Sequence, residues 1–78
     1  MKDTGSRFEI DIEGQTVFAD YRLEDKTLYI THVESPPALR GRGAAGQLMQ
    51  QIIEKTQKET LTVVPICGYA ASWIKRNT

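Results

Sequence analysis

The sequence predicts a mixed α/β (α+β) domain, in which an antiparallel three-stranded meander is followed by a βαβ unit and a short C-terminal helix. Up to residue 33, apolar and polar residues alternate, which is the period of a strand with one solvated face. From residue 44 the apolar residues recur at steps of three and four, which is the period of an amphipathic helix. With 78 residues, the chain has room for one domain, which we expect to span residues 1–78.

The first two strands are expected to form a hairpin. Residues 7–12, RFEIDI, alternate apolar with acidic side chains, and residues 16–23, TVFADYRL, alternate again. The segment EGQ between them contains the glycine that a tight turn favours.

A third strand is expected over residues 27–33, TLYITHV, after the polar turn LEDKT. Simple alternation places His32 on the same face as Leu28 and Ile30. The following ESPP ends this strand, because proline donates no hydrogen bond to a sheet and disfavours helix in the residue before it.

The second half predicts a helix from Ala44 to near Glu59, then a strand over residues 61–66, then a short helix over residues 68–76. The segment LTVVPI is apolar throughout, as expected of a strand buried on both faces. A strand, a helix and a second strand in this order form a parallel βαβ unit. The apolar face of the first helix is Ala45, Leu48, Met49, Ile52, Ile53 and Thr56.

Composition excludes several classes of protein. Ten basic and ten acidic residues give zero net charge, so no overall field attracts nucleic acid or a membrane. The N-terminus lacks the apolar core of a signal peptide and no apolar run could span a bilayer, so we expect a cytoplasmic protein. Cys67 has no second cysteine with which to pair, and no zinc-ligand spacing surrounds it.

Residues 38–47, ALRGRGAAGQ, concentrate glycine and arginine just before the first helix. Their Gly-x-Gly-x-x-Gly spacing fits a dinucleotide fingerprint. Such a fingerprint follows the first strand and needs an acidic residue about twenty positions on, whereas this loop comes after the third strand and nothing after Glu59 is acidic. A Walker loop is excluded because the chain has no Gly-Lys-Ser/Thr. Two alternatives stay open: the small residues only allow close helix packing, or the loop binds an anion.

The anion hypothesis follows from the helix start itself. Such a terminus presents about four unpaired backbone N–H groups and roughly half a positive charge, and glycines let a phosphate approach them. Arg40 and Arg42 add cations that suit a pyrophosphate.

The segment VESPPALRGRGAAGQLMQQIIEK, with its Arg-x-x-Gly-x-Ala, resembles the acyl-CoA site of the GNAT superfamily of N-acetyltransferases. It is most similar to small single-domain members, in which a Pro-x-Cys-x-Tyr element like PICGY (65–69) follows the next strand. The resemblance covers roughly residues 28–73, and two motifs in the right order are more specific than either alone.

The resemblance implies acetyl-CoA as the cofactor and an unidentified amine as the acceptor. Its pantetheine arm would run between strands 28–33 and 61–66, pairing with backbone near Val33 within His32–Glu34, and its thiol end would point toward Cys67. The larger members place two helices after their first strand to wall the acceptor site, and here EGQ leaves no room for them. The loop residues implied in cofactor binding are Arg40, Gly41, Arg42, Gly43, Ala44, Ala45 and Gly46, with the backbone amides from Arg42 to Gly46 holding the pyrophosphate.

Three residues are candidates for catalysis. Amide dipoles at the start of the last helix favour the thiolate of Cys67, the nucleophilic form, although cysteine is also a common small core residue. His32 has the side chain best suited to general-base catalysis at neutral pH, although such a histidine also serves in packing, and Glu34 is the reserve base. Tyr69 is either pocket wall or a proton donor to the departing CoA thiolate.

Two mechanisms remain open: direct attack by an amine that His32 or Glu34 deprotonates, and transfer of the acetyl group through Cys67. A non-catalytic acyl-CoA-binding module and a protein-interaction domain, whose arginine loop contacts an acidic partner, are the alternatives to an enzyme.

Overall fold

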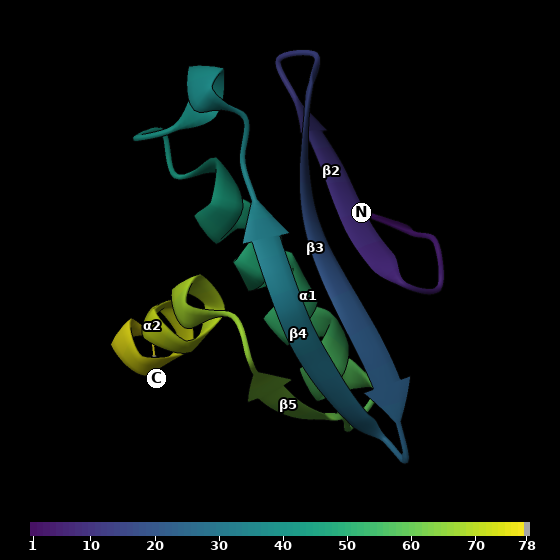
Figure 1. Ribbon diagram of the computed structural model, residues 1–78. Coiled ribbons are helices and arrows are strands. Elements are labelled where there is room, and N and C mark those ends of the chain that lie inside the picture. Colours follow the sequence, from purple (N-terminus) through teal and green to yellow (C-terminus); the bar gives the residue numbers. More distant parts are fainter. Residues whose placement is uncertain (78) are drawn as a thin grey trace.

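The five strands of the computed structural model, which describes residues 1–77, lie in chain order across one sheet (Figure 1). Neighbouring strands are antiparallel from β1 to β4, whereas β4 and β5 are parallel. The elements are β1 (Lys2–Asp3), β2 (Arg7–Ile12), β3 (Gln15–Glu24), β4 (Thr27–Glu34), the 3₁₀ helix η1 (Pro37–Leu39), α1 (Ala44–Lys58), β5 (Thr62–Pro65) and α2 (Gly68–Arg76). The mixed α/β class is confirmed, and β1 is an additional short strand that the alternation does not predict.

Two tight turns shape the meander of β2, β3 and β4. Glu13 and Gly14 join β2 to β3 with φ values of 51° and 77°, and Asp25 and Lys26 join β3 to β4 with φ values of 48° and 63°. Two successive residues of positive φ match the right-handed twist of the strands that they connect. These turns fix the strand registers, and with them the face on which each side chain lies.

One residue of β4 has no partner in β3. Tyr21 pairs with Ile30 and Asp20 pairs with His32, so the register skips Thr31. The Thr31 hydroxyl donates a hydrogen bond of 3.2 Å to the Asp20 carbonyl oxygen. Such a β-bulge reverses the alternation of side chains beyond it.

The expectation that His32 shares a face with Leu28 and Ile30 is wrong, because the bulge precedes it. Because of the extra residue, His32 lies on the face opposite Leu28 and Ile30, and its side chain is 53% exposed. Val33 packs against the core in its place.

The expectation of a fully buried strand over residues 61–66 is also wrong. β5 is the last strand in the order of the sheet, and Val64 and Ile66 are 37% and 57% exposed. Proline suits such an edge, because Pro65 has no N–H group to leave unpaired. The apolar run therefore predicts the strand correctly, but not the burial of its two faces.

The predicted helices are confirmed. Helix α1 begins at Ala44 and ends at Lys58, and α2 spans the predicted residues. Because α1 joins the parallel strands β4 and β5, the βαβ unit is confirmed as well. In the part of the chain that the structure describes, neither helix is long and apolar enough to cross a membrane.

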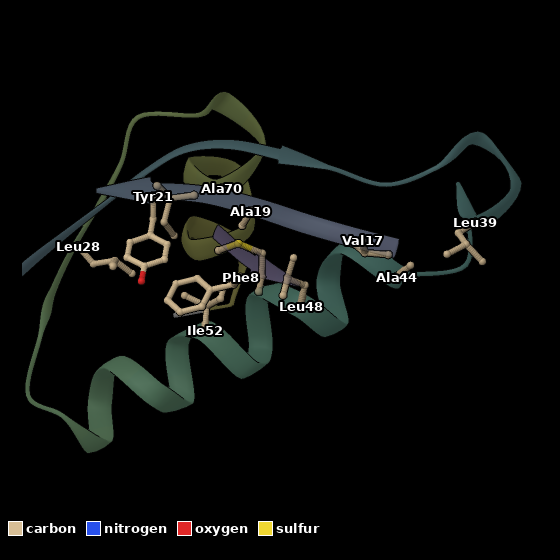
Figure 2. Close-up of a cluster of buried hydrophobic side chains, with 12 residues drawn as sticks. Phe8, Val17, Ala19, Tyr21, Leu28, Leu39, Ala44, Leu48, Ile52 and Ala70 are labelled. Atoms are coloured by element: carbon tan, nitrogen blue, oxygen red, sulfur yellow. The ribbon is translucent and has the colours of Figure 1, made fainter. Parts of the chain in front are cut away.

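Side chains of the sheet and of α1 meet in one buried cluster (Figure 2). The Phe8 and Tyr21 rings stack with centroids 4.2 Å apart, and the Tyr21 hydroxyl donates a hydrogen bond of 2.5 Å to Asp3 Oδ1. This bond ties β1 to the centre of the sheet. The cluster consists of Phe8, Val17, Ala19, Tyr21, Leu28, Ile30, Leu39, Ala44, Leu48, Met49, Ile52 and Ala70.

We expect the protein to lose stability between about pH 10 and about pH 12. Burial, and then the hydrogen bond to Asp3, raise the pKa of Tyr21 from 10.0 to about 12. The folded protein therefore keeps this phenol protonated where the unfolded chain ionises it, so the stabilisation is complete below pH 10 and lost as the pH approaches 12. The loss is on the order of 2–3 kcal/mol and is measured by urea unfolding across this range. Tyr21→Phe is expected to remove this part of the pH dependence, and an identical decline in both proteins would contradict the assignment.

Candidate functional site

A pocket of about 490 Å³ opens where β4 ends and α1 begins. These two segments lie at the same end of the molecule (Figure 1). The volume falls within the roughly 300–1,000 Å³ of most small-molecule sites. The lining residues are His32, Val33, Glu34, Ser35, Leu39, Arg40, Gly41, Gly43, Ala44, Ala45 and Tyr69.

The loop between η1 and α1 has a left-handed backbone at two glycines. Gly41 and Gly43 have φ values of 83° and 72°, a region that other residues occupy only with strain. A Cβ atom at either position would meet nothing within 4 Å, so the backbone conformation and not a lack of space requires glycine. Between them, the Arg42 N–H donates to the Leu39 carbonyl at 3.2 Å, which closes a turn. This bond occupies an amide that the family resemblance implied would hold the pyrophosphate.

The first turn of α1 presents backbone amides to the pocket end of the helix. Gly43 is the N-cap and provides no side chain to accept them, and the first turn has no acidic residue. The first bond across the cap runs from the Gln47 N–H to the Gly43 carbonyl at 3.0 Å. Among the residues described, the amides of Ala44, Ala45 and Gly46 therefore have no acceptor, and they carry the positive end of the helix dipole.

The two loop arginines differ in their surroundings. Arg40 lines the pocket and makes no ion pair with any residue in the described range 1–77. Arg42 lies outside the lining, and its Nη1 is 2.6 Å from Glu13 Oε2 in the turn between β2 and β3. Both side chains of that pair are 61% exposed, so its net stabilisation is small.

Gly46 serves helix packing. A Cβ atom there would lie 3.3 Å from Trp73 Nε1 and 3.9 Å from the Tyr69 hydroxyl oxygen. Because the side chains of α2 cover this position, Gly46 allows the two helices to approach closely. At position 46, the structure therefore supports the alternative in which a small residue allows close helix packing.

Strands β4 and β5 part beside the pocket. Their pairing ends at Ile30 and Pro65, whereas β4 continues to Glu34. The Ile30 carbonyl accepts the N–H groups of both Ile66 and Cys67, at 2.9 and 3.0 Å. Because both hydrogen bonds end on the same carbonyl oxygen, the chain turns out of the sheet here and enters α2.

Three side chains with acid–base chemistry line the pocket. His32 Nε2 lies 3.4 Å from Glu34 Oε1, and both side chains are more than half exposed. Burial raises the pKa of the Tyr69 phenol, while the charge of Arg76 opposes the shift and Cys67 adds to it. The Tyr69 phenol is therefore protonated at neutral pH and can donate a proton or a hydrogen bond.

Cys67 is the half-buried N-cap of α2 and packs against the core. Its backbone carbonyl accepts the Ala71 N–H at 3.0 Å. It is not among the lining residues, although Tyr69, two positions along, is.

The structure thus brings most of the predicted site residues to one pocket and places Arg42, Gly46 and Cys67 beside it. Sequence reasoning missed Ser35 and Leu39. Leu39 has a signal, because it is the one large apolar residue of an otherwise small and polar segment. Ser35 has none, because a serine after a strand is common in loops.

No group of three or more histidine, cysteine, aspartate or glutamate residues in the described part of the chain is placed to hold a metal ion.

Comparison with protein families gives a match over most of the chain. The model of the family described as GCN5-related N-acetyl-transferase matches residues 7–78, which includes every element from β2 to α2. No curated protein matches the chain.

Gly46→Val is expected to destabilise the protein by about 1–3 kcal/mol, as overpacking does, and to change the fluorescence of Trp73, the single tryptophan. Urea unfolding followed by this fluorescence measures both effects. Gly68→Ala is the matched control, because a Cβ atom there meets nothing within 4 Å. If Gly46→Val is as stable as this control, the two helices do not depend on close approach at Gly46.

Proposed function

Because the chain belongs to the GCN5-related N-acetyltransferase family, we propose that its pocket binds acetyl-CoA and that it transfers the acetyl group to an amine. The observation that carries this proposal is that one pocket joins the unpaired amides at the start of α1 to the unpaired cation Arg40.

The donor set fits a pyrophosphate. The amides of Ala44 and Ala45, both in the pocket lining, carry hydrogens that no carbonyl of the described residues accepts. Arg40 supplies a guanidinium whose paired N–H groups suit a phosphate. With no acidic residue in the first helical turn, the field at this end of the pocket favours an anion.

The gap between β4 and β5 suits the pantetheine arm. Beyond Ile30, β4 has no partner on the side of β5, and Val33 and its neighbours line the pocket. An extended chain that contains amides can pair with such a free strand edge, as peptides do. This orientation directs the thioester toward His32 and Tyr69, the lining residues farthest along the chain from the glycine loop.

Two routes for the transfer remain within the proposal. In the direct route, His32 or Glu34 takes a proton from the amine, which attacks the thioester carbonyl. The CoA sulfur leaves and takes a proton from Tyr69, which its raised pKa keeps protonated. In the covalent route, the Cys67 sulfur bonds to the carbonyl carbon as the CoA sulfur leaves, and the amine then displaces the sulfur of Cys67.

The positions of the groups differ between the routes. His32 and Glu34 are already in the pocket lining, whereas Cys67 reaches the thioester only if its side chain turns from the core toward Tyr69. This favours the direct route as the first to test.

Arg40→Ala is expected to weaken coenzyme A binding by about 1–3 kcal/mol, the usual loss for a charge-assisted contact. Arg42→Ala is the matched control and is expected to cost less, because Arg42 is held by Glu13 outside the lining. Isothermal titration calorimetry at two salt concentrations measures both, and the affinity of the wild type is expected to fall as salt rises. An equal loss in the two variants would contradict the placement of the phosphates beside Arg40, and no binding by the wild type would contradict the proposed function.

Cys67→Ala is expected to retain acetyl transfer to polyamine or peptide acceptors if the direct route holds, and to show no acetyl adduct by intact mass spectrometry. His32→Gln, which keeps a polar side chain, is then expected to lower the rate and leave coenzyme A affinity unchanged. Loss of transfer in Cys67→Ala, together with an acetyl adduct on the wild type alone, would establish the covalent route. Binding without transfer to any amine would replace the enzyme with a non-catalytic acyl-CoA-binding module.

A further inference from the structure

Ser35 is a polar residue of the pocket wall with an unsatisfied hydroxyl. Its Oγ is buried and has no hydrogen-bond partner among the described residues, and the residue lines the pocket between Glu34 and Pro36. Buried polar atoms nearly always have a partner, and an exception calls for a physical explanation. A change of the Ser35 side-chain rotamer about the Cα–Cβ bond moves this oxygen to another staggered position, and this change is the movement that a contact with a ligand in the pocket requires.

The groups around Ser35 identify the kind of partner. Ser35 continues β4 into η1, so it borders the end of the pocket that Leu39, Arg40 and Gly41 line. The Glu34 carboxylate, which precedes Ser35 and also lines the pocket, is an acceptor and lies 3.4 Å from His32 Nε2. The remaining polar groups at this end include a set of donors: the guanidinium of Arg40 and the unpaired amides at the start of α1. A donor hydroxyl completes such a set only when the ligand is rich in acceptors.

We infer that the Ser35 hydroxyl is a specificity-determining donor that completes the anion site by hydrogen bonding to a phosphate oxygen of the bound pyrophosphate. This inference rests on the proposed function, since it names a further contact for the same ligand. It also goes beyond the loop motif, because Ser35 lies outside the glycine and arginine positions and belongs to the end of β4.

The unsatisfied state of the free protein has a consequence for stability. A hydroxyl buried without a partner costs free energy, and a methyl group in its place does not. Ser35→Ala is therefore expected to leave the free protein as stable as the wild type or more stable, and yet to weaken ligand binding. A residue with a purely structural hydrogen bond gives the opposite result, because its loss destabilises the free protein.

The test compares wild type, Ser35→Ala and the control Ser72→Ala, which removes an exposed hydroxyl from α2. The probes are coenzyme A and ADP, which shares the pyrophosphate and lacks the pantetheine arm. We expect Ser35→Ala to bind both probes about three- to tenfold more weakly, the usual effect of one hydrogen bond, with no loss of stability in urea. Ser72→Ala is expected to match the wild type in both measurements.

The outcomes separate this inference from the proposed function. If the wild type binds neither probe, the proposed function fails, and the inference fails with it. If the wild type binds coenzyme A and Ser35→Ala binds it equally well, the inference alone is overturned. A loss for coenzyme A without a loss for ADP overturns the phosphate as the partner, and a destabilised free Ser35→Ala shows that the hydroxyl has a structural role.

Discussion

The pocket depends on one carbonyl group, that of Ile30. It accepts the amides of both Ile66 and Cys67, so β5 ends at this level of the sheet and the chain turns into α2. The bulge at Thr31 follows immediately on β4. As a result, β4 continues from Thr31 to Glu34 without a partner on the side of β5. Its side chains beyond the bulge lie on the opposite faces from those that simple alternation gives. A regular strand pair at this place would have closed the gap and filled the pocket with backbone.

The end of the pocket proposed to bind an anion combines the backbone amides at the start of α1 with one unpaired cation, Arg40. The chain has no net charge, and one of the two loop arginines is already paired, with Glu13. The left-handed glycines at 41 and 43 turn the chain so that α1 starts without a capping side chain, and its first amides stay free. A helix dipole and unpaired amides act over a few ångströms. The proposed site therefore does not require the whole surface to be basic in order to attract an anion.

The sequence predicted the elements well and the side-chain faces less well. Alternation and helical spacing are local properties, so the hairpin, α1 and α2 emerged near their observed bounds. The bulge at Thr31 depends on how β4 pairs with β3, which alternation in one strand cannot show, and so His32 was expected on the wrong face. The exposure of β5 was missed because an apolar run does not reveal that the sheet ends there. In the loop, the glycine pattern led to the pocket, but it could not separate Gly43, which sets the backbone, from Gly46, which admits Trp73.

On the outer face of the sheet, arginine side chains cover apolar surface that a helix would otherwise cover. No helix lies in front of β2, β3 and β4 in Figure 1, and the outer aromatic rings are covered by arginines instead: Arg7 lies 3.9 Å from the centroid of Phe18, and Arg22 lies 4.9 Å from that of Tyr29. Arg7 also pairs with Asp20, the strand partner of His32. These contacts shield apolar surface and keep the face polar. The His32 and Glu34 side chains at this end of the pocket are more than half exposed. Under the proposed function, an acceptor amine would therefore be recognised by the few side chains around them rather than by an enclosed second half-site.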